Sequence, residues 1–110
     1  MKSLILYINE KLHINQYEDE YKILQKELGD KFNIRQKKSG GFELIPNNVD
    51  KSNPKINDKI YSIYDGTLRY QVYGKYVIGD PRWKQAQIIK RDLSNIHEII
   101  NVLKNYLNKH

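Results

Sequence analysis

Two alternating runs joined by a tight turn decide the fold: KIYSIY at residues 59–64, DG at 65–66 and TLRYQVY at 67–73. Alternation of apolar and polar residues is typical of strands with one buried face, and Asp-Gly between two such runs is a strong hairpin signal. A second reversal at Gly74-Lys75 leads to a third short strand over Lys75 to Ile78. This part of the chain therefore predicts a three-stranded antiparallel meander.

The second of these strands has one apolar and one polar face, because successive side chains of a strand point to opposite sides. Leu68, Tyr70 and Val72 fall on the apolar face. The other face carries three side chains that can contact a ligand: Arg69, Gln71 and Tyr73.

A second hairpin is expected upstream. The run from Phe32 to Gln36 alternates, as does the run from Phe42 to Ile45, and the turn residues 37–41 separate them. Pro46 ends this hairpin. Residues 47–58 contain only two aliphatic residues and no period, so we expect a mobile loop there.

Helices are expected before this hairpin. Residues 15–28 begin with a capping box, Asn15 to Glu18, and continue with an apolar stripe up to Gly29, a natural helix stop. The apolar run within residues 3–12 fits a helix face, and a buried strand is the alternative.

Two helices are expected after the meander. Asp80-Pro81 has the pattern of an N-cap followed by proline, which predicts a helix over 81–93, and a strand from Lys84 to Lys90 is the alternative. A capping box from Asn95 to Glu98 opens a strongly amphipathic helix over 96–107. The apolar stripe of this last helix can lie in the core or form a homodimer seam.

The predicted class is α+β, because strands and helices are segregated along the chain. An antiparallel sheet, built from the β-hairpin and the three-stranded meander, is packed by N-terminal helices and two C-terminal helices. Residues 1–110 are long enough for a single domain.

Composition indicates the cellular compartment of the protein and the kind of genome that encodes it. The chain has no cysteine and no apolar run long enough for a membrane span, so we expect a cytoplasmic protein without membrane contact. Ile, Lys, Asn and Tyr make up 50 of the 110 residues, and their codons are A/T-rich. We expect a gene from a phage, plasmid or other mobile element of an AT-rich genome.

The residues offer little catalytic chemistry. His13, His97 and His110 lack the spacing of a zinc helix, and the glycines do not form a phosphate-binding loop. Asp65 and Asp80 occupy a predicted turn and a predicted cap. We therefore expect no metal, no cofactor and no enzymatic activity.

One short motif, in contrast, indicates an enzymatic activity. The seven residues from Arg91 to His97 are similar in spacing to the arginine and histidine of HEPN ribonucleases, an all-helical family. The resemblance implies a small toxin-like endoribonuclease with Arg91 and His97 acting on the phosphodiester, and Arg69 is the further residue that could take part. This activity is the third functional hypothesis.

Positive charge is the main functional signal, with 19 basic against 13 acidic residues and a net charge of +6. Basic side chains neutralise phosphates, aromatic rings stack on bases, and Arg and Gln read base edges. The expected binding residues lie in the first hairpin, in the meander and along the exposed side of the predicted helix 81–93: Arg35, Lys37, Lys38, Arg69, Gln71, Tyr73, Lys75, Arg82, Lys84, Gln87 and Arg91.

The stretch from Gly66 to Gly79 and the segment after it resemble the three-strands-then-helix modules of integrase-arm DNA-binding domains. The resemblance covers less than a third of the chain and implies that Arg69, Gln71 and Tyr73 read bases. The first hypothesis is a small non-enzymatic protein that binds DNA or RNA. The second is an inhibitor, of the anti-CRISPR or anti-restriction type, that binds a nucleic-acid-handling host defence protein.

Overall fold

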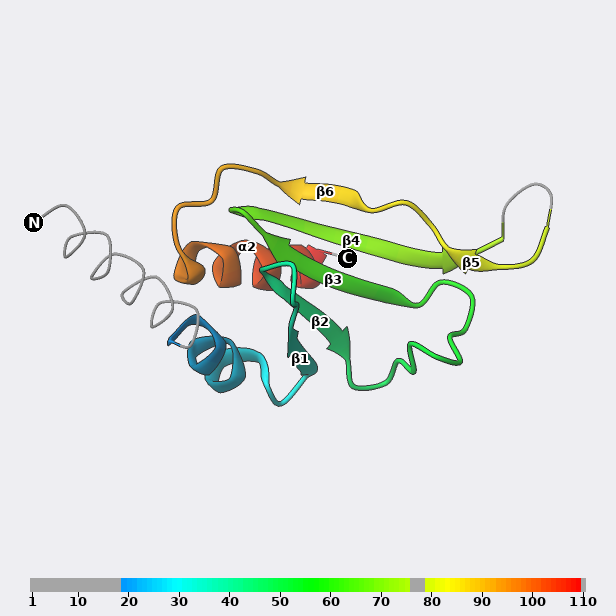
Figure 1. The fold of residues 1–110 in the computed structure, drawn as a ribbon, viewed down its shortest axis with the longest axis horizontal. Helices are drawn as coiled ribbons and strands as arrows, with labels where there is room; N and C mark the ends of the chain where they lie inside the picture. The colour runs from blue at the N-terminus through cyan, green and yellow to red at the C-terminus, as the bar shows by residue number, and fades with distance from the viewer. Residues whose placement is uncertain (1–18, 76–78, 110) are drawn as a thin grey trace, which may run out of the picture.

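The computed structural model describes residues 19–75 and 79–109 of the chain. Within them lie a helix over residues 19–28, an antiparallel sheet of six strands, and the helix α2 (Ile96–Lys109), as Figure 1 shows. The predicted α+β class is confirmed.

Parts of the expected structure lie outside the described residues. They include the helix predicted over 3–12 and the first residues of the helix predicted over 15–28. Most of the strand predicted from Lys75 to Ile78 lies outside them too, and Lys75 itself belongs to no strand.

The central hairpin forms as predicted. β3 (Lys59–Tyr64) and β4 (Thr67–Gly74) pair antiparallel along their whole common length. Asp65 and Gly66 have φ of 49° and 70°, the left-handed backbone that a type I′ turn requires at both central positions. The twist of this turn matches that of the strands, which is why Asp-Gly fixes the register here.

The upstream hairpin is also confirmed. β1 (Phe32–Gln36) pairs with β2 (Phe42–Pro46), and β2 pairs with β3, so the order across the sheet is β1-β2-β3-β4. Gly41 has φ of 78°, and a Cβ atom there would overlap the carbonyl oxygen of Ile63. Glycine therefore lets the hairpin turn lie close against the end of β3.

The helix predicted over 81–93 is wrong. β5 (Arg82–Trp83) and β6 (Gln87–Lys90) instead pair with the far edge of β4, so one helix, not two, follows the meander. An unpaired edge of β4 would expose a row of backbone donors and acceptors. Pairing satisfies them: the amide of Lys84 donates to the carbonyl of Val72 at 2.9 Å. The alternative prediction of a strand from Lys84 to Lys90 is closer to the structure.

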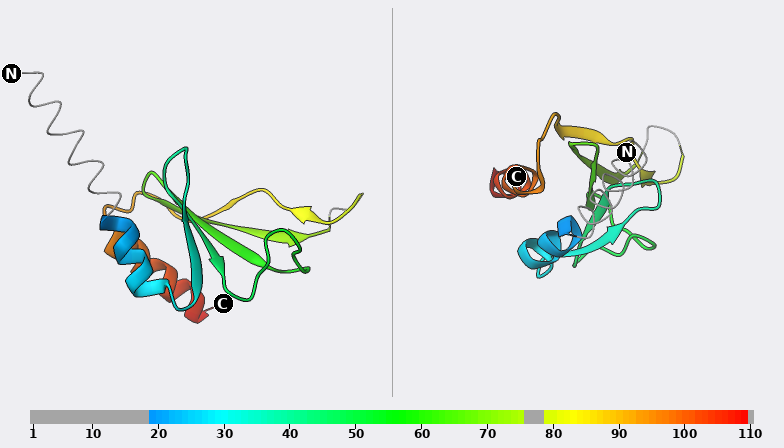
Figure 2. Two further views of the ribbon diagram at one scale, coloured as in Figure 1. Left: turned by 60° about the horizontal axis from the view of Figure 1, so that its bottom comes forward. Right: turned by 60° about the vertical axis from the view of Figure 1, so that its left-hand side comes forward.

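Both described helices cover the same face of the sheet, as the two views of Figure 2 show. An ion pair between Lys104 of α2 and Glu27 of the first helix, 3.2 Å long, joins them at the surface. The opposite face of the sheet carries no helix of the described residues.

The start of α2 is capped as the sequence predicts. The Asn95 side-chain oxygen accepts from the backbone amide of Glu98 at 2.9 Å. The Glu98 carboxylate accepts from the amide and the hydroxyl of Ser94, at 2.9 and 2.6 Å, rather than from Asn95. These hydrogen bonds from Ser94 lower the pKa of Glu98.

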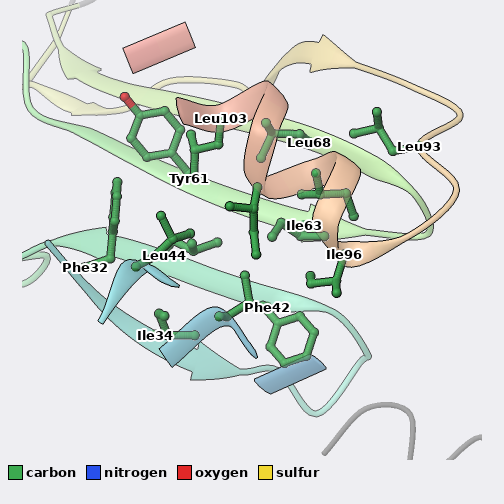
Figure 3. Close-up of a cluster of buried hydrophobic side chains, with 14 residues drawn as sticks. Phe32, Ile34, Phe42, Leu44, Tyr61, Ile63, Leu68, Leu93, Ile96 and Leu103 are labelled. Atoms are coloured by element: carbon green, nitrogen blue, oxygen red, sulfur yellow. The ribbon is translucent and has the colours of Figure 1, made fainter. Parts of the chain in front are cut away.

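The core fills the space between the helices and one face of the sheet (Figure 3). Ile99 and Leu103 of α2 are buried in it, so the apolar stripe of this helix belongs to the core of one chain and is not exposed as a dimer seam. The buried members of the core come from both helices, the strands and the linker before α2: Leu24, Leu28, Phe32, Ile34, Phe42, Leu44, Tyr61, Ile63, Leu68, Leu93, Ile96, Ile99, Ile100 and Leu103.

We predict that Leu103→Ala lowers the free energy of unfolding by about 2–5 kcal/mol, because the leucine is fully buried and its removal leaves a cavity. Urea unfolding followed by circular dichroism measures the change. The control, Asn105→Ala on the exposed side of α2, should change stability by about 0.5 kcal/mol or less. An equal effect of both substitutions would contradict the packing of α2 described here.

A second prediction concerns Tyr61, whose ring packs edge-on against Phe32 with ring centroids 5.8 Å apart. Burial, reinforced by the neighbouring Tyr106 and Tyr70, raises the pKa of Tyr61 from 10.0 to about 12. The folded state therefore keeps the neutral phenol, and stability should be retained below pH 10 and lost as pH rises towards and beyond 12.

We expect Tyr61→Phe to flatten this alkaline loss, measured as the free energy of unfolding across the same pH range. Tyr64→Phe, which changes a half-exposed tyrosine, should leave the loss as it is. A wild-type and a Tyr61→Phe protein with the same pH dependence would show that Tyr61 ionises as readily when folded as when unfolded.

Candidate nucleic-acid interface

One row of side chains crosses the face of the sheet that faces away from the helices. Register pairs link its members one strand at a time, and register partners project from the same face. The row runs from β1 to β6: Arg35, Glu43, Ser62, Arg69 and Ile88. We call this surface the open face.

Glu43 lies near the middle of the row and is buried, with 7% of its surface exposed. Its carboxylate accepts from the Lys51 ammonium group at 2.8 Å and lies 3.8 Å from that of Lys37. A buried carboxylate is costly unless it is paired, and here two lysines compensate its charge. Lys51 comes from the loop 47–58, so this ion pair fastens the loop to the sheet.

The two arginines of the row are placed differently. Arg35 is exposed and Arg69 is partly exposed, and among the described residues neither guanidinium forms an ion pair. Three strand spacings separate β1 from β4, so the two backbones lie about 14 Å apart. Within the described part of the chain, the open face thus presents two positive charges without ion pairs, beside a carboxylate that is already neutralised.

Gln71 and Tyr73 share this face, as predicted, and both hold the neighbouring segment in place. The Gln71 amide donates to the carbonyl of Lys84 at 3.0 Å, and the Tyr73 hydroxyl donates to that of Pro81 at 3.1 Å. The Tyr73 ring also packs edge-on against Trp83, with centroids 5.4 Å apart. These interactions use the Tyr73 hydroxyl donor and one of the two N–H donors of the Gln71 amide within the protein.

The remaining predicted residues do not form the stripe that a helix over 81–93 would have made. Lys37 and Lys38 lie in the β1–β2 turn beside the open face. Four others lie along the extended segment at the sheet edge and in the linker before α2: Arg82, Lys84, Gln87 and Arg91. Lys75 is exposed just after β4.

The structure adds residues that the sequence did not single out. Lys51 lies in an aperiodic loop, and nothing in the sequence indicates that it returns to Glu43. Asn33, Arg35 and Ile45 form a groove of about 530 Å³ with residues 49–52 on the open face. Tyr64 lies two residues after Ser62 on β3 and therefore on the same face, and half of its surface is exposed.

Neither a metal site nor the ribonuclease site suggested by the HEPN resemblance is assembled in the described part of the chain. No group of three or more His, Asp or Glu side chains in residues 19–75 and 79–109 could hold a metal ion. Arg91 lies in the linker and His97 in the first turn of α2, so the two do not share a helix as the HEPN resemblance implies. No helix of the described residues is long and apolar enough to cross a membrane.

Comparison with protein-family models, with curated proteins and with solved structures finds no match for this chain.

We predict that Glu43→Gln lowers the free energy of unfolding by about 1–2 kcal/mol, because it removes the charge that Lys51 and Lys37 compensate. Glu27→Gln is the matched control. Both partners of the Glu27–Lys104 pair are more than 40% exposed, so its loss should cost about 0.5 kcal/mol or less. Urea unfolding measures both, and a Glu43→Gln protein as stable as wild type would show that the pair does not hold the loop.

Proposed function

We propose that this chain is a small non-enzymatic protein that binds nucleic acid through the open face. The observation that carries the proposal is the row itself, in which Arg35 and Arg69 form no ion pair with any described residue while Glu43 is neutralised by two lysines. Phosphate groups are the natural partners of such guanidinium groups, since arginine binds them with two parallel hydrogen bonds.

Further charge around the row supports the proposal. Lys37 and Lys38 flank the open face at one hairpin turn, and Arg82 and Lys84 lie at the edge of the same sheet. Helices cover the other face, and the loop 47–58 covers part of the open face, where Glu43, Ile45 and Ile60 are buried. The uncovered part around Arg35 and Arg69 is the surface on which phosphates can lie. Such binding is largely electrostatic and weakens steeply as salt rises.

The test is fluorescence anisotropy of labelled DNA and RNA oligonucleotides, single- and double-stranded, at about 50 and 200 mM salt. We expect Arg35→Ala/Arg69→Ala to weaken binding about 3- to 30-fold, from up to about 1 kcal/mol for each exposed ionic interaction. The double variant should also lower the salt slope by about 0.7–0.9 for each phosphate that the arginines no longer neutralise.

The matched control is Lys22→Ala/Lys26→Ala, which removes the same charge from exposed positions of the first helix. Its effect should be small, because these lysines lie on the helix layer behind the sheet. Equal losses of affinity in the two double variants would show attraction to net charge alone, without a defined interface. An absence of binding to every oligonucleotide at about 50 mM salt would overturn the proposed function.

A second candidate function is binding to a protein, as an inhibitor of a nucleic-acid-handling partner would do. One observation favours it: β6 lies at the sheet edge among the described strands, and Ile88 within it is 40% exposed. Such an edge can accept an added strand from a partner. The anisotropy measurement separates the candidates, because an inhibitor of this kind needs no affinity for nucleic acid alone.

A further inference from the structure

A small pocket lies at one end of the open face, beside the β1–β2 turn. It has a volume of about 240 Å³. Its lining combines two cations, two serine hydroxyl groups and one tyrosine ring with the residues around them: Lys37, Ser39, Gly40, Ser62, Ile63, Tyr64 and Arg69. Ser62 and Arg69 are register partners and belong to the row of side chains on the open face, so this pocket is continuous with that row.

Tyr64 is the unusual member of the pocket, because half of its surface is exposed although it is a large side chain at the end of a central strand. Its ring rests against Gly40: a Cβ atom at that position would lie 3.3 Å from the Tyr64 Cε2 atom. The absence of a side chain at Gly40 thus leaves room for the ring beside the β1–β2 turn. A half-exposed ring held beside the turn is suited to stacking against a flat ligand.

The positive groups next to this ring suit a phosphate. Arg69 forms no ion pair among the described residues, and Lys37 lies 3.8 Å from a carboxylate that Lys51 holds more closely. A ring beside two cations matches a nucleotide unit, in which a flat base is joined to a phosphate.

The pocket is smaller than the roughly 300–1,000 Å³ that enclose a whole small ligand, so it suits one unit of a longer chain. The width of the open face then indicates whether the bound nucleic acid is single-stranded or double-stranded. The row spans five strands, about 19 Å at about 4.8 Å per spacing, whereas the major groove of B-DNA is only about 12 Å wide. A surface of this width cannot enter that groove, and the bases of a duplex are not available for stacking.

We infer that the open face binds a single-stranded polynucleotide, with one base stacked on Tyr64 and the adjoining phosphates on Arg69 and Lys37. The inference rests on the proposed function and specifies its ligand. Stacking on a ring tolerates any base, so little sequence preference is expected.

The test compares labelled strands of about 12 nucleotides, as DNA and as RNA, with duplexes of the same sequence by anisotropy. Single strands should bind more tightly than duplexes. Tyr64→Ala should weaken single-strand binding about 5- to 100-fold and leave its salt slope unchanged, because stacking releases no counterions. Tyr64→Phe should stay within about twofold of wild type, since it keeps the ring.

Ile56→Ala, which removes another exposed apolar side chain from the loop 47–58, is the control and should have no effect. Circular dichroism checks that each variant is folded. Duplexes bound as tightly as single strands, or a Tyr64→Ala protein with wild-type affinity, would overturn the inference while leaving the proposed function intact. Failure of the wild-type protein to bind any oligonucleotide would overturn both. The DNA and RNA arms decide which polynucleotide is bound.

Discussion

The register of the antiparallel strands is the constraint on which the rest of the structure depends. Because side chains alternate, the pairing that places Ile63 opposite Leu68 in the core also places Ser62 opposite Arg69 on the open face. A shift of one residue would bury the arginine and expose the leucine. The hydrophobic core and the row of side chains on the open face therefore both result from the same strand pairing. The helices determine which face of the sheet becomes the core.

Much of the fold could be predicted where local chemistry decides it. The left-handed turn at Asp65 and Gly66 fixes the central hairpin, and the cap at Asn95 fixes the start of α2. The segment 81–93 could not be predicted in this way. Its apolar spacing fits a helix, but the edge of β4, 8 to 22 residues earlier in the chain, would otherwise stay unpaired, and the segment pairs with it as strands.

The candidate site likewise has a part that the sequence could predict and a part that it could not. Strand parity alone placed Arg69 on the polar face of β4, and the hairpin pattern of β1 and β2 left Arg35 as a basic residue of that hairpin. The compensation of Glu43 by Lys51 depends on the path of an aperiodic loop, which no period in the sequence encodes. This matters for the proposed function, since an unpaired carboxylate at Glu43 would repel the phosphates that we propose the arginines bind.

The most direct test of the account is an NMR titration of the ¹⁵N-labelled protein with a short single-stranded oligonucleotide, following the backbone amides. The account predicts that the largest shifts lie in the strands of the open face, at residues such as Arg35, Ser62 and Arg69, and that α2 and residues 19–28 change little. Shifts confined to the two helices would contradict it, because the helix layer and not the open face would then be the binding surface.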